Sequence, residues 1–399
     1  MTPVVPEALY TGPNALAQHY SRFRVADRLL LTGHSHQAWP DCGFAAQQQA
    51  WKDAAELVDE KWERAFAKAD RVRRGWAQLL GDAPDRIALG ASTHDLVVQF
   101  LSALPLQRRP RLITTDGEFH TIRRQLDRLA EEGVEVVKVP SEPASDISTK
   151  LQAAVDDRTA AVMVSAVLFQ NAHIVPGLGA VLDACQLVGA ELLVDAYHAL
   201  DAIEFRLDTE KLEAAFVVGG GYKYCQLGEG NCFLRFPEQC ALRPVVTGWF
   251  REFSALARPE TAGVAYGDGP DRFAGATYDP TSHYRAAAVF DFFEEQRLTP
   301  PLLREVSRHQ VGLLAEAVDA LDVPPDLISR DRRTPLERIG GFLALRTPKA
   351  AEVSGALRDH GVLTDYRGDI LRLGPAPYLN DEQLGEAVDA LGIVVRTLE

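Results

Sequence analysis

A single lysine stands among glycines and tyrosines in the stretch VVGGGYKYCQLGEGN, residues 217–231. The three glycines follow an apolar run, and glycine permits backbone conformations and close approaches that a side chain would forbid. The stretch has neither the GxxxxGK[ST] spacing of a phosphate-binding P-loop nor the GxGxxG spacing of a dinucleotide-binding turn. We therefore expect Lys223 to form a Schiff base with a carbonyl cofactor such as pyridoxal phosphate.

That chemistry needs an acid that keeps the pyridine nitrogen of the cofactor protonated. In ELLVDAYHALDA, residues 191–202, Asp195 ends an apolar run, and open α/β sheets bind ligands at the carboxyl ends of their strands. Taken alone, Asp195 could be an ordinary turn residue and Lys223 an exposed surface lysine. Together they indicate a cofactor site. His198, three residues past the same run, is equally compatible with a hydrogen-bonded core position.

Short apolar runs alternate with helical stretches between RIALG (86–90) and NCFLRF (231–236). This alternation predicts a mostly parallel sheet covered on both faces. Residues 43–80 predict two helices, and residues after 280 predict an α+β region with two or three short strands. The apolar positions expected to pack in the first two helices are Trp51, Trp62, Phe66 and Trp76.

The composition is that of a soluble globular chain, with 399 residues of which 46% are hydrophobic and 25% charged. A net charge of −14, with the two signs interspersed, argues against nucleic-acid binding and against an anionic-membrane anchor. We find no secretory leader and no apolar run long enough to span a bilayer, so we expect a cytoplasmic protein. Five scattered cysteines without a CxxC pair favour reduced thiols over disulfides or structural zinc.

The DxxH element followed by a glycine-bounded YKY resembles pyridoxal-phosphate (PLP) enzymes of fold type I, in the class V aminotransferase group, and within it the kynureninases. The resemblance implies a large α/β domain with a mostly parallel seven-stranded sheet, residues 46–279, and a smaller α+β C-terminal domain, residues 280–399. Residues 1–45 would contribute to the active site and to the small domain. The resemblance also implies a homodimer with shared active sites.

The resemblance implies catalytic roles for Lys223, Asp195 and Tyr222, with Tyr222 transferring a proton near the cofactor phosphate. Ser92 and Thr93 precede a helix whose N-terminus would hold that phosphate, although such a pair is also a common helix cap. Further contacts to the cofactor would come from Phe119, which stacks on the ring, and from Asn171, His198, Trp249 and Thr277, the last of these reaching the partner subunit.

On the substrate side, the spacing in LLLTGHSHQAWPD, residues 29–41, resembles a kynureninase element that lies beside the substrate. We therefore expect His34, Ser35 and His36 to contact an amino-acid substrate. Arg372, in ILRLGPAPYLN, matches the arginine that binds its carboxylate, for which a bidentate guanidinium is suited.

The implied reaction is hydrolysis of an aryl-keto amino acid, in which the Cβ–Cγ bond breaks to give an anthranilate-like acid and alanine. Class V transamination or a β-lyase reaction on another amino acid is the alternative, because these enzymes share the same early chemistry. A cysteine desulfurase is disfavoured, because such enzymes carry a nucleophilic cysteine in the C-terminal third of the chain and no cysteine follows Cys240 here. A more distant alternative is a metal-dependent hydrolase that uses the His34/His36 pair.

Overall fold

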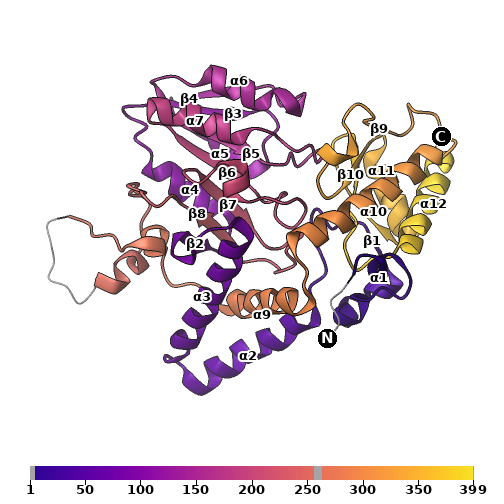
Figure 1. The fold of residues 1–399 in the computed structure, drawn as a ribbon, viewed down its shortest axis with the longest axis horizontal. Coiled ribbons are helices and arrows are strands. Elements are labelled where there is room, and N and C mark those ends of the chain that lie inside the picture. The colour runs from indigo at the N-terminus through magenta and orange to yellow at the C-terminus, as the bar shows by residue number, and fades with distance from the viewer. Residues whose placement is uncertain (1–4, 256–262, 399) are drawn as a thin grey trace.

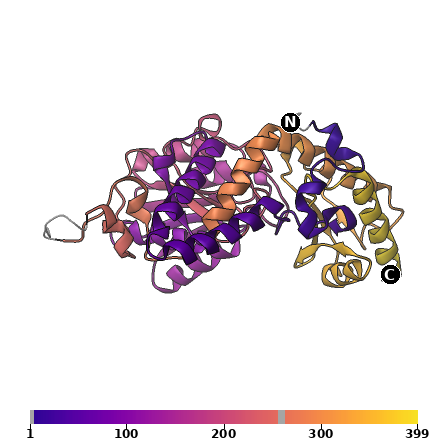
Figure 2. The same cartoon turned by 90° about the horizontal axis from the view of Figure 1, so that it is seen from below.

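The computed structural model describes residues 5–255 and 263–398, which form two lobes that lie side by side (Figures 1 and 2). A seven-stranded sheet forms the centre of the larger lobe, and its strands are parallel except for β8, which runs antiparallel to both of its neighbours. The predicted α/β fold with a mostly parallel seven-stranded sheet is thereby confirmed. In spatial order the strands are β2 (Ile87–Gly90), β8 (Cys232–Arg235), β7 (Phe216–Gly220), β6 (Glu191–Asp195), β5 (Thr159–Ser165), β3 (Arg111–Thr115) and β4 (Glu135–Val139).

The central strands β5, β6 and β7 are buried because helices cover both faces of the sheet, and their polar residues stand only at the strand ends. All seven residues of β5, TAAVMVS, are buried. The helices that connect the strands show one apolar stripe instead; in α5, for example, Ile122 and Leu126 are buried and the arginines face outward. The connecting helices are α4 (Thr93–Ala103), α5 (His120–Glu131), α6 (Ile147–Ala154), α7 (Leu178–Val188) and the short α8 (Leu207–Glu210).

The smaller lobe has more strands than the sequence pattern indicated. Four antiparallel strands form a sheet in the order β12-β13-β10-β9, and β1 pairs in parallel with β11. The expectation of two or three strands was wrong because several of these strands are only two or three residues long, too short to show an alternating pattern. The strands are β1 (Leu29–Leu30), β9 (Ser329–Arg330), β10 (Leu343–Arg346), β11 (Val362–Leu363), β12 (Asp365–Arg367) and β13 (Ile370–Leu373).

Three helices complete the smaller lobe, α10 (Pro300–Ala320), α11 (Ala350–Asp359) and α12 (Asp381–Thr397). The side chain of Asn380 and that of Gln383 form a reciprocal capping box that starts α12. The α+β character predicted for this region is confirmed. Among the described helices, none is both long enough and apolar enough to cross a bilayer.

The predicted helix pair near the N-terminus is present as α2 (Asp41–Leu57) and α3 (Lys61–Leu80), and a short α1 (Glu7–Tyr10) precedes it. α9 (Thr281–Gln296) packs against both α2 and α3, as Figure 1 shows. The domain boundary predicted at residue 280 therefore precedes a helix that lies on the larger lobe. β1, in contrast, joins the N-terminal segment to the smaller lobe through β11.

One tryptophan attaches the α3 layer to the sheet. The ring of Trp76 in α3 is fully buried, with ring centroids 4.6 Å from Phe233 of β8 and 5.4 Å from Phe290 of α9. Gly75 allows α9 to approach, because a Cβ at this position would lie 2.5 Å from the Phe290 ring. Trp51, which the sequence pattern also indicated as an apolar packing position, is 80% exposed on α2.

We predict that Trp76→Ala lowers the free energy of unfolding by about 3–5 kcal/mol, because it removes a large side chain from a closed interface. Trp51→Ala is the matched control and should change the same quantity by less than about 0.5 kcal/mol. Urea unfolding followed by circular dichroism measures both values. Equal losses for the two variants would show that Trp76 does not join the layers.

Candidate functional site

The candidate site lies where the parallel strands of the large sheet end. β3, β5, β6 and β7 end at Thr115, Ser165, Asp195 and Gly220, and all four run in the same direction. Their carboxyl ends therefore lie at one edge of the sheet, which is where open α/β sheets bind ligands. The predicted residues at or just after these ends are Phe119, Asp195, His198, Tyr222 and Lys223.

The amine of Lys223 is enclosed by rings and a histidine. The residue is 4% exposed, and its Nζ atom lies 2.9 Å from His198 Nε2. Nζ also lies 4.6 Å from the ring centroid of Tyr197, 5.1 Å from that of Phe119 and 5.5 Å from that of Tyr222. The geometry brings these sequence-distant residues together around one amine.

Burial shifts the ionisation of the groups in this enclosure towards their neutral forms. It lowers the pKa of Lys223, and the nearby carboxyl of Asp195 opposes this shift only in part. Burial raises the pKa of Asp195. Two smaller effects lower it: the backbone N–H of Tyr197, which donates to Oδ1 at 2.9 Å, and the charge of Lys223. Burial also lowers the pKa of His198, as do the charges of Lys223 and Arg372. A buried amine with a lowered pKa is suited to nucleophilic attack on a carbonyl.

Glycines shape the turn that presents Lys223. A Cβ at Gly220 would lie 2.5 Å from the Tyr197 ring and 2.6 Å from Cys232 Sγ, and a Cβ at Gly221 would lie 2.6 Å from Leu227. The chain can therefore pass close to its neighbours only without side chains at these positions, as the GGG run predicted.

The N-terminus of α4 lies at the same edge of the sheet. Cys232 in β8 pairs with Gly90, which ends β2, on one side and with Gly220 on the other. The chain after Gly90 leads directly into α4, whose N-cap is Ser92, and the backbone of Thr93 partly offsets the burial that raises the pKa of the Cys232 thiol. The Ser92 Oγ atom accepts from the backbone N–H of Asp95 at 3.1 Å and donates to the Asp95 carboxylate at 2.9 Å. A helix N-terminus favours negative charge, so this end of α4 is suited to bind an anion.

Sequence reasoning missed Glu118, the residue before Phe119. Its carboxyl is 1% exposed and accepts from Thr115 Oγ1 at 2.7 Å and from Ser165 Oγ at 2.6 Å. Ser165 is the direct partner of Asp195 in the β5–β6 register. Burial, with a smaller contribution from the charge of Asp195, raises the pKa of Glu118 to about 7 against the lowering effect of its hydrogen bonds. The sequence signal that could have indicated Glu118 is an acidic residue between an apolar strand and the residue expected to stack on the cofactor ring.

Tyr222 lies between Lys223 and the N-terminal segment. The ring of His36 stacks on it, with centroids 4.8 Å apart and planes inclined by 17°, and His36 Nε2 lies 3.7 Å from Glu229 Oε1. Burial raises the pKa of Tyr222 to about 12, so its hydroxyl keeps its proton at neutral pH. Ser35 donates from Oγ to the carbonyl of Thr32 at 3.0 Å and closes the turn that carries both histidines.

A second cluster joins the N-terminal segment to the smaller lobe. His34 is fully buried and its Nε2 lies 2.6 Å from Asp365 Oδ1, while Arg372 forms a bidentate ion pair with the same carboxylate. The charges of Arg372 and Asp365 act on the pKa of Lys223, in opposite directions. Arg372 also donates from Nη1 to the carbonyl of Phe169 at 2.7 Å, and the Phe169 ring centroid lies 5.3 Å from that of Phe119, so this cluster adjoins the lysine enclosure.

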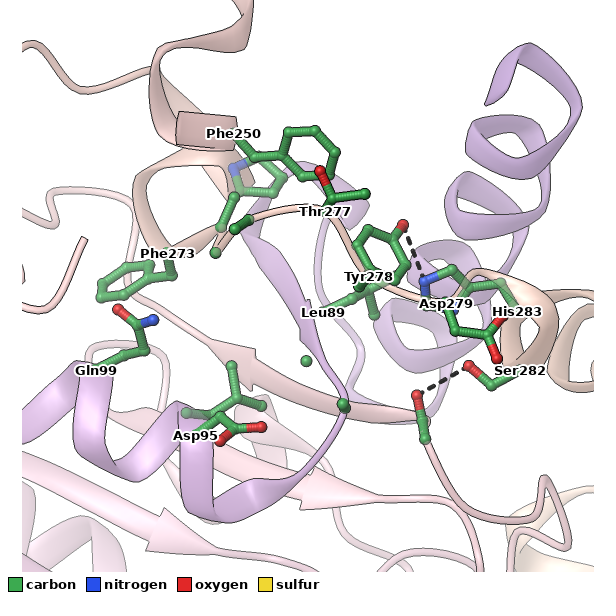
Figure 3. Close-up of a pocket in the computed structure, with 18 of the residues that line it drawn as sticks. Leu89, Asp95, Gln99, Phe250, Phe273, Thr277, Tyr278, Asp279, Ser282 and His283 are labelled. Carbon is green, nitrogen blue, oxygen red and sulfur yellow. Dashed lines mark hydrogen bonds between the residues drawn. The ribbon is translucent and has the colours of Figure 1, made fainter. Parts of the chain in front are cut away.

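Three predicted cofactor contacts are not gathered around Lys223. Asn171 donates to Glu142 Oε1 at 2.8 Å and lines a separate cavity of about 970 Å³ beside β9 and β10. Trp249 donates from Nε1 to Thr277 Oγ1 at 3.3 Å, and Thr277 lines a cavity of about 960 Å³ whose walls Figure 3 shows. Neither cavity includes Lys223. The cofactor roles of these three residues stay predictions.

The His34/His36 pair does not form the metal site that the sequence suggested as an alternative. His34 is bonded to Asp365, and His36 stacks on Tyr222. In residues 5–255 and 263–398, no group of three or more histidine, cysteine or acidic side chains is arranged to hold a metal ion.

Solved structures of known proteins share the fold of this chain. In the described structure the chain superposes on a cystine C-S lyase, the C-DES mutant with glycine covalently linked to its PLP cofactor, with a TM-score of 0.83 over 94% of this chain and 98% of that one at 14% identity. The apo cysteine desulfurase of Thermococcus onnurineus NA1 gives a TM-score of 0.80 over 96% and 98% at 18% identity. The fold is therefore that of the fold type I PLP-dependent enzymes.

Sequence relatives agree with this class. Residues 303–391 match the kynureninase C-terminal domain family. The chain is 24% identical over 346 residues to the uncharacterized aminotransferase YcbU of Bacillus subtilis (strain 168), covering 86% of this chain and 88% of that protein. It is 27% identical over 367 residues to isopenicillin N epimerase of Streptomyces clavuligerus, covering 85% and 87%. It is 22% identical over 351 residues to kynureninase of Geobacillus thermodenitrificans (strain NG80-2), covering 82% and 78%.

These comparisons confirm the predicted resemblance to the PLP-dependent class V group, which has aminotransferase, epimerase and kynureninase relatives. Pyridoxal phosphate, predicted from the sequence, is the cofactor of that group.

We predict that Glu118→Gln removes a pH dependence of stability. The folded state keeps the proton of Glu118 up to about pH 7, whereas the ordinary pKa of this carboxyl is 4.5. The stability of the wild type therefore falls as pH rises through this window, and the glutamine variant should be more stable by on the order of 2 kcal/mol at pH 8. Urea unfolding between pH 5 and pH 8 measures the difference.

The matched control for this prediction is Glu131→Gln, at an exposed position in α5, which should leave the pH dependence unchanged. Parallel pH curves for wild type and Glu118→Gln would show that Glu118 ionises normally in the folded state.

Proposed function

We propose that this protein is a PLP-dependent enzyme that acts on an amino acid, and that its reaction is kynureninase-type hydrolysis of an aryl-keto amino acid to an anthranilate-like acid and alanine. The observation that carries the proposal is the buried Lys223 amine, with the buried carboxyl of Asp195 near it and the Phe119 ring centroid 5.1 Å away. The match of residues 303–391 to the kynureninase C-terminal domain supports the choice of reaction.

The residues of the site fit pyridoxal phosphate. When bound, this cofactor supplies an aldehyde that condenses with an amine and a protonated pyridine ring that withdraws electrons. Lys223 would hold the aldehyde carbon, Asp195 the ring nitrogen, Phe119 one ring face, and the N-terminus of α4 the phosphate. Each functional group of the cofactor therefore has a residue of matching chemistry at this edge of the sheet.

The chain's own residues would then move protons and orient the substrate. Lys223, whose pKa burial lowers, would hold a free electron pair near neutral pH and accept a proton from the substrate Cα. Tyr222 would keep its hydroxyl proton available for donation, because its pKa is raised to about 12. Arg372 would bind the substrate carboxylate. His198, in contact with the Lys223 amine, would orient that amine.

Transamination is the second candidate, and the relationship to the aminotransferase YcbU favours it. The two reactions share the steps at Cα and diverge afterwards, because only hydrolysis requires water at the γ-carbonyl. The proposed setting is amino-acid metabolism in the cytoplasm, where a kynureninase reaction would serve tryptophan catabolism.

We also propose a homodimer with shared active sites. Thr277 and Phe250 line the cavity in Figure 3, outside the enclosure of Lys223, and Trp249 donates to Thr277. A position at the rim of the large lobe suits residues that reach the cofactor of a partner subunit.

We predict that adding pyridoxal phosphate gives the wild type a visible absorbance band that Lys223→Ala lacks. Reduction with borohydride would then leave a covalent label, which mass spectrometry of peptides should locate on Lys223. Lys52→Ala, at an exposed lysine of α2, is the control and should behave as the wild type. A label on another lysine, or an unchanged band in Lys223→Ala, would refute the assignment.

We predict that the loaded enzyme releases anthranilate and alanine from kynurenine, and that it does so without a keto acid. The measurement is fluorescence of the released anthranilate, alongside a panel of amino-acid and keto-acid pairs. Release of anthranilate supports hydrolysis. If the protein instead exchanges amino groups within the panel and leaves kynurenine intact, it is an aminotransferase.

A further inference from the structure

Asp365 and Arg372 are built into the smaller lobe as a cross-strand pair. They are direct partners in the β12–β13 register. Arg372 donates from Nε to Asp365 Oδ1 at 2.9 Å and from Nη2 to Asp365 Oδ2 at 2.5 Å. Its Nη1 donates to the carbonyl of Phe169, at 2.7 Å, in the larger lobe. The guanidinium is therefore held on one edge by a carboxylate and at one tip by a carbonyl.

The N–H groups of Arg372 are only partly used by these bonds. A guanidinium has five N–H groups, and the bonds to Asp365 and Phe169 use three of them. Within the described part of the chain, one N–H therefore remains on each terminal nitrogen of a side chain that is only 3% exposed. Two such N–H groups are what a carboxylate ligand accepts in a bidentate contact.

His34 fixes the carboxylate in turn. Burial lowers the pKa of His34 to about 4 in spite of its bond to Asp365, so the ring is neutral at pH 7. A neutral ring facing a carboxylate oxygen at 2.6 Å carries its proton on Nε2 and donates it. Gly374 lets the backbone pass close to this ring, because a Cβ at that position would lie 2.1 Å from His34 Nδ1.

Among the described residues, Arg367 is the one further cation within ion-pair distance of Asp365. Arg367 lies two positions along β12, with its Nη1 atom 3.7 Å from Asp365 Oδ2, and it is largely exposed. This distance is longer than a hydrogen bond, so Arg367 adds charge without fixing the orientation of Asp365. The orientation therefore depends on His34 and Arg372.

We propose that Asp365 is the residue that positions Arg372 for the substrate carboxylate, and that His34 holds Asp365 in that orientation. This inference rests on the proposed function, in which Arg372 binds the carboxylate of an amino acid. Asp365 occupies the Nε/Nη2 edge of the guanidinium and so restricts the substrate to the two remaining N–H groups. His34, predicted from the sequence to contact substrate, acts here through Asp365.

The test measures binding of propionate, which is alanine without its amine and so cannot react with the cofactor. Calorimetry on the loaded protein gives its dissociation constant. Asp365→Asn should raise this constant by at least about tenfold, because the amide replaces one acceptor by a donor that faces the guanidinium. If Asp365 instead competes with the ligand for Arg372, the same variant binds propionate more tightly, and the proposal fails. An unchanged constant also overturns it.

A pair of variants at His34 tests the second half of the proposal and remains informative if Asp365→Asn fails to fold. His34→Gln retains an N–H donor and should bind propionate nearly as the wild type does, whereas His34→Phe retains a ring without a donor and should bind several-fold more weakly. Equal constants for the two variants would show that the donated proton does not matter. Arg367→Ala is the matched control and should stay within about twofold of the wild type.

Two further readouts separate this inference from the proposed function. If Arg372→Ala binds propionate as the wild type does, the carboxylate site itself is misplaced and the proposed role of Arg372 fails. If Lys223 takes up no pyridoxal phosphate, the proposed enzyme class fails. The changes in the propionate dissociation constant for Asp365→Asn and for the two His34 variants can therefore be interpreted independently of these two results.

Discussion

The amine of Lys223 and the carboxyl of Asp195 lie in the same water-poor region at the edge of the large sheet. Burial moves their pKa values towards each other, the lysine down and the aspartic acid up, while their mutual attraction opposes both shifts. Neither group could be held there alone without a large cost in solvation. A ligand that presents an aldehyde to one group and a basic ring nitrogen to the other would satisfy both.

The rest of the large lobe serves to place these two groups. Parallel strands bring Asp195, Lys223 and Phe119 to one edge although they lie far apart in the chain. Glycines after β7 let the lysine turn pass against Tyr197 and Leu227. Glu118 adds a second buried carboxyl, which accepts from the hydroxyls of Thr115 and of Ser165, the strand partner of Asp195. The residues around Lys223 are thus brought together by the carboxyl ends of strands that the sheet aligns.

Contacts to Arg372 connect the two lobes. Its guanidinium bonds to a carbonyl of the larger lobe and to a carboxylate of the smaller one, and that carboxylate bonds to a histidine of the N-terminal segment. Three separate parts of the chain therefore determine where one cation lies. The charge of this cation lowers the pKa of Lys223, so the position of the smaller lobe affects the ionisation of that amine.

The sequence by itself determined the sheet, the two N-terminal helices, and the strand ends that carry Lys223, Asp195 and Phe119, because strand periodicity and glycine punctuation are local signals. Only the tertiary structure decided which of the other residues join them. Asn171 bonds to Glu142 in a different cavity, Glu118 bonds to the strand partner of Asp195, and Asp365 bonds to Arg372. These outcomes depend on how the strands and lobes pack. Burying a charged group costs free energy through desolvation, and packing decides both how deeply the group is buried and which partner offsets that cost. No local sequence pattern records this burial.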